Sequence, residues 1–223
     1  MEPVIKNTKW KAGWIVGFIC AGLLAFKLIS IITGPMPKRP NLLLITLDTL
    51  RPDHLNVYGY HRATSPSLSK LAEDSFVFEN AYTVATNSGP SHATLLTGLY
   101  PAQHGLLNNG QKIQVPTLAE TLRQRGYDTA GFVGYYALGE ESGLDKGFEN
   151  FEYHPIASHE HDEKKDDLKG FKAVTGWLES WAQTPVDSRS PFFAWMHVQN
   201  IHESYDPPPP YNAMFGKISS LQS

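Results

Sequence analysis

The chain has 223 residues, of which 41% are hydrophobic and 18% are charged. This is the composition of a globular protein that is long enough to bury one sizeable core. The formal net charge of −3 gives no basic field of the kind that attracts nucleic acid, so we expect no nucleic-acid partner. The single cysteine, Cys20, excludes a disulfide within the chain and does not decide the compartment.

The first element in chain order is an apolar segment, Ala12–Thr33, whose only charge is Lys27. A helix of this length spans about 30 Å, the thickness of a bilayer core. A buried soluble helix is seldom so long and so evenly apolar, and no small-x-small site for removal of a signal peptide follows. We therefore expect residues 12–33 to be an uncleaved transmembrane signal anchor, with membrane lipid as its partner.

Charges on both sides of this segment set the expected orientation. Three lysines lie within residues 1–11, and Lys38 and Arg39 lie in the short, stiff linker of residues 34–40. The bias is weak, but it favours a cytoplasmic N-terminus. We therefore expect a single-pass membrane protein whose domain, residues 41–223, lies on the extracytoplasmic side.

Short apolar runs alternate with helical patterns along residues 41–223. Strands are expected at 41–47, 76–78, 127–133 and 191–196, the first of them buried on both faces. Helices are expected at 65–74, 90–97, 116–125 and 166–182, from their proline starts, glycine ends or apolar stripes. This alternation predicts an α/β fold with a mainly parallel sheet covered by helices on both faces.

Three histidines lie among carboxylates in the segment His154–Asp167. A metal site is conceivable there, but no apolar frame surrounds these side chains to hold ligands rigidly. We expect a solvated loop instead.

Two polar residues are expected beyond the carboxyl ends of the parallel strands, where such sheets bind ligands. Asp48 directly follows the first strand, and a carboxylate there is suited either to a hard divalent cation or to capping the turn at residues 51–55. Ser88 lies at the start of the helix that contains Pro90, near the positive end of the helix dipole and several free N–H groups. It is suited either to nucleophilic attack beside a bound oxyanion or to an ordinary N-cap. We expect the Asp48 and Ser88 oxygens to lie roughly 3–6 Å apart.

Five sequence blocks in a fixed order resemble a known family. They are ITLDTLRPDHLNVYGY, SPSLSKLAEDSFVFENAY, SGPSHATLLTGLYPAQHG, PTLAETLRQRGYDTAGFVG and the region NIHESYDPP. Together, from about Asn41 to Tyr211, they are similar to the N-terminal domain of sulfatases in the alkaline phosphatase superfamily. The resemblance implies a truncated fold of that kind, with Asp48 and the Ser88 oxygen as metal ligands and Ser88 as nucleophile. It also places His92 in the nucleophile motif and His202 at a substrate-contacting or acid–base position.

The chain departs from the sulfatase pattern at three places. Thr49 follows Asp48 where sulfatases carry a second acid, and the basic pair of the Gly-Lys-x-His-Leu-Gly element is replaced by tyrosines and alanine between Gly134 and Gly139. His92 stands where conversion of the nucleophile to formylglycine depends on an arginine, so we expect Ser88 to remain a serine. With these departures the chain resembles the branch of the superfamily whose nucleophile is an unmodified serine or threonine. Members of that branch act on phosphoryl as well as sulfuryl esters.

The resemblance also implies ligands that this sequence does not contain. Sulfatases supply the remaining metal ligands from an Asp-His or Asp-Asn element beyond the His202 region, and the chain ends at Ser223 without one. We therefore expect a metal-dependent hydrolase of sulfuric or phosphoric esters (using Ca²⁺, Mg²⁺, Mn²⁺ or Zn²⁺) that is incomplete and inactive as this fragment. The alternatives are a membrane-anchored transferase of phosphoglycerol or phosphoethanolamine type and a non-catalytic truncated remnant.

Overall fold

The structure is a computed structural model, and it describes residues 39–154, 169–202 and 209–215. The chain divides between Pro40 and Asn41, and every element described below belongs to the second unit, Asn41–Ser223. The expected anchor at residues 12–33 and most of the His154–Asp167 loop lie outside the described residues. Within the described part, no helix is both long enough and apolar enough to cross a bilayer.

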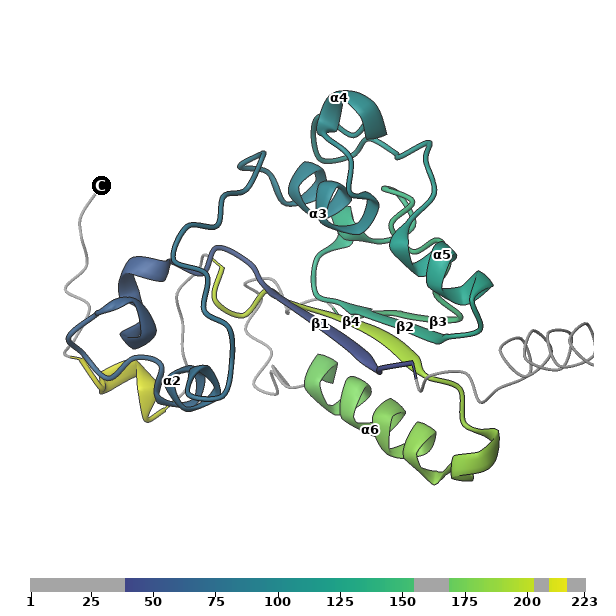
Figure 1. The fold of residues 1–223 in the computed structure, drawn as a ribbon. Helices are drawn as coiled ribbons and strands as arrows, with labels where there is room; N and C mark the ends of the chain where they lie inside the picture. Colours follow the sequence, from purple (N-terminus) through teal and green to yellow (C-terminus); the bar gives the residue numbers. More distant parts are fainter. Residues whose placement is uncertain (1–38, 155–168, 203–208, 216–223) are drawn as a thin grey trace, which may run out of the picture. The chain divides into compact units, whose positions relative to one another are not determined.

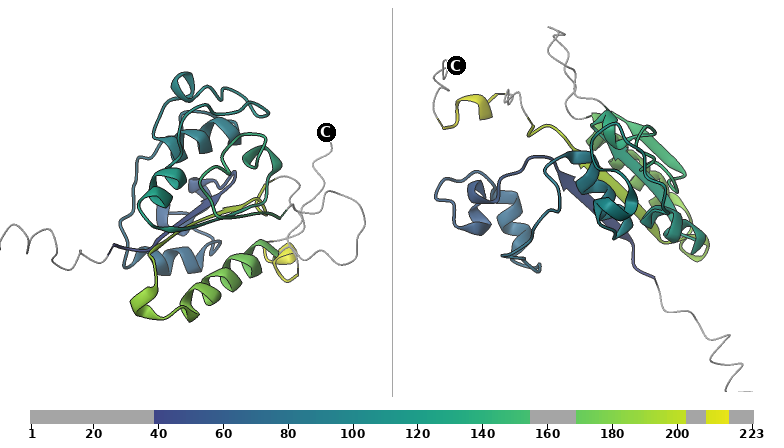
Figure 2. Two further views of the ribbon diagram at one scale, coloured as in Figure 1. Left: turned by 90° about the vertical axis from the view of Figure 1, so that its right-hand side faces the viewer. Right: turned by 90° about the horizontal axis from the view of Figure 1, so that it is seen from above.

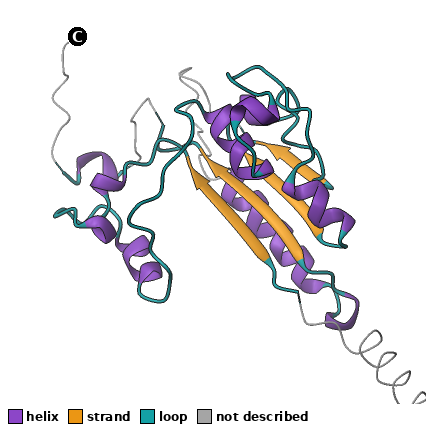
Figure 3. Ribbon diagram, turned by 45° about the horizontal axis from the view of Figure 1, so that its top comes forward, coloured by secondary structure: helices purple, strands orange, loops and turns teal. Residues whose placement is uncertain are grey.

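Four parallel strands form the centre of the second unit (Figures 1 and 3). They are β1 (Leu42–Leu47), β2 (Asp128–Val133), β3 (Asn150–Tyr153) and β4 (Phe192–Val198), in the order β1-β4-β2-β3. Because the last strand in the sequence inserts between the first two, β4 is hydrogen-bonded on both edges, with Leu44 and Gly131 both paired to Trp195. The predicted parallel sheet is confirmed.

Five helices were found in the described residues. They are α2 (Pro66–Ala72), α3 (Ser88–Thr97), α4 (Pro101–His104), α5 (Leu118–Gln124) and α6 (Lys169–Gln183). The four predicted helices correspond to α2, α3, α5 and α6, whereas α4 and the strand β3 were not predicted. Helix α5 begins with a complete capping box, in which Thr117 and Glu120 each bond to the other's backbone N–H.

The sheet has a hydrophobic core on each face, with α3 and α5 over one face and α6 over the other (Figures 1 and 2). Alternation along β4 divides its side chains between the two: Phe193 and Trp195 face the α3 side, and Met196 and Val198 face the α6 side. The prediction of helices on both faces is therefore confirmed.

Strand β1 is more exposed than the sequence predicts. We expected a strand buried on both faces, but Leu43 is 49% exposed and Ile45 is 52% exposed. The reason is position, since within the described residues β1 is the outermost strand and pairs only with β4. An edge strand lacks the flanking neighbour and covering helix that bury a central one.

The predicted strand at residues 76–78 is wrong. These residues have no regular secondary structure, and Phe76 is 97% exposed. A β-rich apolar triplet becomes a strand only where another strand satisfies its backbone groups, and the described residues provide none at this place.

Candidate active site

Asp48 lies at the carboxyl end of β1, where its backbone N–H continues the sheet ladder by donating to Val198 O over 2.9 Å. The next residue, Thr49, has a φ of +56°, which is unusual for a β-branched residue. Its hydroxyl bonds to Ile201 O at 3.3 Å, in the segment after β4. The chain thus turns away sharply after Asp48, and the carboxylate is left at the edge of the sheet. Asp48 does not cap the following turn, because Arg51 occupies that position.

Ser88 is the first residue of α3, and Asn87 occupies the N-cap. The interpretation of Ser88 as an N-cap is therefore wrong. Its hydroxyl instead donates to Asp48 Oδ2 over 3.0 Å, although 40 residues separate the two in sequence. The predicted proximity of these two side chains is confirmed, and both are partly accessible at the carboxyl end of the sheet.

The start of α3 offers fewer free N–H groups than the sequence predicts. Asn109 Oδ1 accepts from Gly89 N–H at 2.8 Å, Pro90 has no N–H, and Ser91 N–H bonds to Asn87 O at 3.2 Å. The expectation of several free donors after Ser88 is therefore wrong, because a loop side chain and a turn satisfy them. The Asn109 amide also donates to Tyr135 Oη at 3.2 Å, which ties this loop to the end of β2.

His197 is a member of the site that sequence reasoning missed. It lies on β4 with its side chain fully buried, and its Nε2 is 3.5 Å from Asp48 Oδ2. At this distance the contact is an electrostatic pair at the long limit of hydrogen bonding. The His197 imidazole lowers the pKa of the Asp48 carboxyl, and this effect outweighs the opposite effect of partial burial. The signal in the sequence was a histidine near the end of an otherwise apolar strand, FFAWMHV.

His92, predicted as part of the nucleophile motif, lies one turn into α3. Its Nδ1 is 2.7 Å from Ser88 O and therefore donates to it, because a carbonyl oxygen only accepts. Burial, assisted by the neighbouring His197, lowers the pKa of His92 to about 4. A neutral imidazole at this position cannot supply the permanent positive charge that arginine would give to a bound oxyanion.

His202 lies just beyond β4, in a turn closed by its N–H to Gln199 O at 2.8 Å. Because β1 and β4 are parallel, this turn follows the same end of the sheet as Asp48. Its expected acid–base role stays a prediction.

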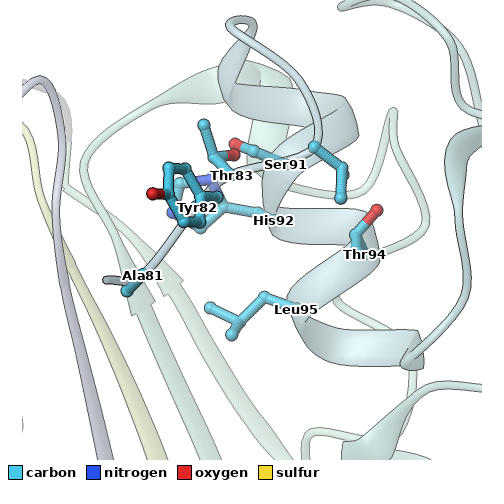
Figure 4. A pocket seen from close by; sticks show the side chains of 8 residues that line it. Ala81, Tyr82, Thr83, Ser91, His92, Thr94 and Leu95 are labelled. Carbon is cyan, nitrogen blue, oxygen red and sulfur yellow. The ribbon is translucent and has the colours of Figure 1, made fainter. Parts of the chain in front are cut away.

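A pocket of about 350 Å³ borders the site (Figure 4). Ala81, Tyr82 and Thr83 line it together with Ser91, His92 and Leu95 of α3. Ser88 and Asp48 are not among the residues that line it. The pocket thus reaches the first two turns of α3 through Ser91 and His92.

Residues 40–221 of this chain match the model of the sulfatase family. The chain belongs to the sulfatase family. Arylsulfatase G of Rattus norvegicus is 30% identical over 156 residues, a match that covers 64% of this chain and 30% of that protein.

Solved structures of sulfatase-like fold agree with this assignment. A protein in complex with its substrate D-glucosamine-2-N,6-O-disulfate has a TM-score of 0.62 and 24% identity, and it covers 80% of this chain and 38% of that one. A phosphonate monoester hydrolase from Silicibacter pomeroyi has a TM-score of 0.59 and 21% identity, with 79% and 44% covered. This chain thus spans less than half the length of each of these three proteins.

The oxygens of Asp48 and Ser88 fit one part of a divalent-metal site of the sulfatase type. The Ser88 oxygen lies 3.0 Å from Asp48 Oδ2, so the two side chains could contribute to one site, and both are partly accessible. Hard cations take at least six oxygen ligands, and the described residues contain no group of three His, Cys, Asp or Glu side chains suited to a metal. The other ligands would be water, substrate oxygens or residues outside the described part.

Proposed function

We propose that this chain contributes the nucleophile of a sulfatase-family site that hydrolyses sulfuric or phosphoric esters, with Ser88 as the covalent nucleophile. The observation that supports this most is the 3.0 Å hydrogen bond from the Ser88 hydroxyl to Asp48 Oδ2. A serine at a helix start normally caps that helix, whereas this one is directed at a carboxylate on another element. Such a hydroxyl is held in one rotamer, with its lone pairs free to attack.

The reaction that this arrangement supports has two displacements. Ser88 Oγ loses its proton and forms a bond to sulfur or phosphorus, while the bond from that atom to the ester oxygen breaks. The ester oxygen takes up a proton and leaves, so the number of protons is unchanged and a serine ester remains. Water then attacks the same centre, releases sulfate or phosphate and restores the serine hydroxyl. Asp48, ionised because its pKa is lowered, accepts the hydrogen bond from the hydroxyl and orients it. His202 is the residue we assign to protonating the leaving oxygen.

A divalent cation held by Asp48 and Ser88 would supply positive charge that polarises the ester oxygen and favours the serine alkoxide. The positive end of the α3 helix dipole would also stabilise negative charge on the Ser88 oxygen. The neutral His92 implies that binding of the anionic group depends on this charge rather than on a cationic residue in the nucleophile motif. The pocket beside His92 is the place we assign to the uncharged body of the substrate.

The test is turnover of 4-nitrophenyl sulfate and 4-nitrophenyl phosphate by the full protein and by Ser88→Ala. We expect the substitution to lower turnover by about 10³-fold or more, as loss of a covalent nucleophile does. Ser69→Ala in α2 is the matched control, because it removes a serine hydroxyl that bonds to Ser65 O, at the N-cap of the same helix. Mass spectrometry of the peptide containing Ser88 should show an unmodified serine at rest and a serine ester after quenching during turnover.

Three results would contradict parts of this proposal. Formylglycine at position 88 would exclude an unmodified serine nucleophile. Transfer of the group to added glycerol in preference to water would support the phosphoryl-transferase alternative. Absence of turnover and of any serine ester, in a protein that folds, would support a non-catalytic role.

A further inference from the structure

Burying His197 in β4 costs free energy, and its neighbours along this strand do not offset that cost. All seven residues of β4 are buried, and every neighbour of His197 along the strand is apolar. Among the described residues, neither ring nitrogen of His197 has a hydrogen-bond partner that meets strict geometry. Burying an unpaired polar group costs about 1–3 kcal/mol, and an apolar residue would fill this position without that cost.

The polar and aromatic groups nearest the His197 ring are two residues of the candidate site, Asp48 and His92. His197 pairs with Thr46 in β1, two residues before Asp48, and with Val133 in β2. Its ring meets the His92 ring edge-on, with centroids 5.0 Å apart. The one carboxylate within 4 Å in the described part is Asp48, whose Oδ2 lies 3.5 Å from Nε2.

Two contacts converge on the same oxygen of Asp48. The Ser88 hydroxyl donates to Oδ2 over 3.0 Å, and His197 Nε2 approaches Oδ2 as well. With Oδ2 held from two sides, rotation of the carboxylate about its last bond is restricted. Oδ1 then becomes the atom presented to whatever enters the site, such as a cation or a substrate group.

We propose that His197 is a positioning residue that fixes the Asp48 carboxylate, acting as an Nε2–H donor to Oδ2 so that Oδ1 faces the site. This role rests on the proposed function and adds a supporting residue to it. His197 of β4 would hold the side chain of Asp48, which follows β1. The donor acts through Asp48 and has no contact with Ser88 in this assignment. Supporting partners of this kind commonly change metal affinity or activity by 10–100-fold when removed.

The first experiment needs no turnover. The full chain is labelled with ¹⁵N-histidine, and long-range ¹H–¹⁵N spectra identify the tautomer of each ring, with His197→Gln assigning its signal. We expect His197 to carry its proton on Nε2, and we expect that signal to shift in Asp48→Asn. Asp53→Asn, which changes an exposed acid, is the matched control and should leave the signal in place. A proton on Nδ1, or an Nε2 signal unaffected by Asp48→Asn, would overturn the proposal.

The second experiment separates positioning from folding. We expect His197→Leu to lower turnover of the full protein by about 10–100-fold, and His197→Gln, which keeps an N–H donor, to restore most of it. His104→Gln is the control for loss of a buried histidine, because His104 is fully buried and contacts Thr94 of α3 instead of Asp48. Equal losses in His197→Leu and His197→Gln would overturn the donor role. If the unsubstituted protein shows no turnover, the proposed function fails, and the tautomer still decides the role of His197.

Discussion

Strands β1 and β4 lie side by side in one sheet, and they are almost equally apolar, yet their environments differ greatly. Every residue of β4 is at most 9% exposed, whereas Leu43 and Ile45 of β1 are about half exposed. The difference comes from topology, because β4 has a strand on each edge and a core on each face, whereas β1 has one neighbouring strand in the part of the chain that the structure describes. Burial is therefore decided by where a strand is inserted.

The comparison also separates two kinds of functional contribution. Asp48 directly follows β1 at the carboxyl end of the sheet, and its side chain is partly exposed, at 11%. Strand β4 carries His197 and Trp195 beside it, both inaccessible. The Trp195 indole donates to Thr46 Oγ1 at 3.1 Å, so the buried strand holds the edge strand through a side chain as well as through the ladder. The partly accessible carboxylate thus follows the edge strand, and the buried side chains next to it lie on the central strand.

The largest expected effect is that of Trp195→Ala. Trp195 is fully buried in the core on the α3 side and also bonds to Thr46. We expect the free energy of unfolding in urea to fall by about 3–5 kcal/mol, because a large cavity forms at the centre of the sheet. A decrease of less than about 1 kcal/mol in the free energy of unfolding would contradict the view that β4 is tightly packed while β1 is exposed.

Two glycines with similar backbone angles give an intermediate test outside the strands. Gly147 has a φ of +90°, and an added Cβ would lie 2.1 Å from Glu120 N at the start of α5. Gly59 has a φ of +92°, with no atom within 4 Å of an added Cβ. We expect Gly147→Ala to destabilise the fold by about 2–4 kcal/mol and Gly59→Ala by about 1 kcal/mol, measured by thermal unfolding. Equal losses would mean that backbone strain alone accounts for both.

The smallest expected effect is that of Ile45→Thr on the exposed edge. Because this side chain is half exposed and β-branched like its replacement, we expect a change within about 0.5 kcal/mol in the free energy of unfolding. Solubility should rise, since the substitution removes apolar surface from an unpaired strand edge. A loss of more than about 1 kcal/mol would show that another part of the protein covers this edge in solution.

The sequence by itself determined the parallel α/β class, four of the five helices found in the described residues, and the proximity of Asp48 and Ser88. Each follows from local rules: apolar runs of strand length, proline and glycine at helix ends, and the location of ligands beyond parallel strands. The family assignment likewise rested on blocks of sequence in order, and the match over residues 40–221 confirmed it.

Only the tertiary structure decided which strand lay at the edge, which donors at the start of α3 were already used, and that His197 belonged to the site. The physical reason is the same in each case, because these properties depend on partners far away in sequence. His197 and Asp48 are separated by 149 positions and meet through the β1–β4 ladder. The exposed triplet at residues 76–78 is the converse case, in which a local preference for strand found no partner to satisfy it.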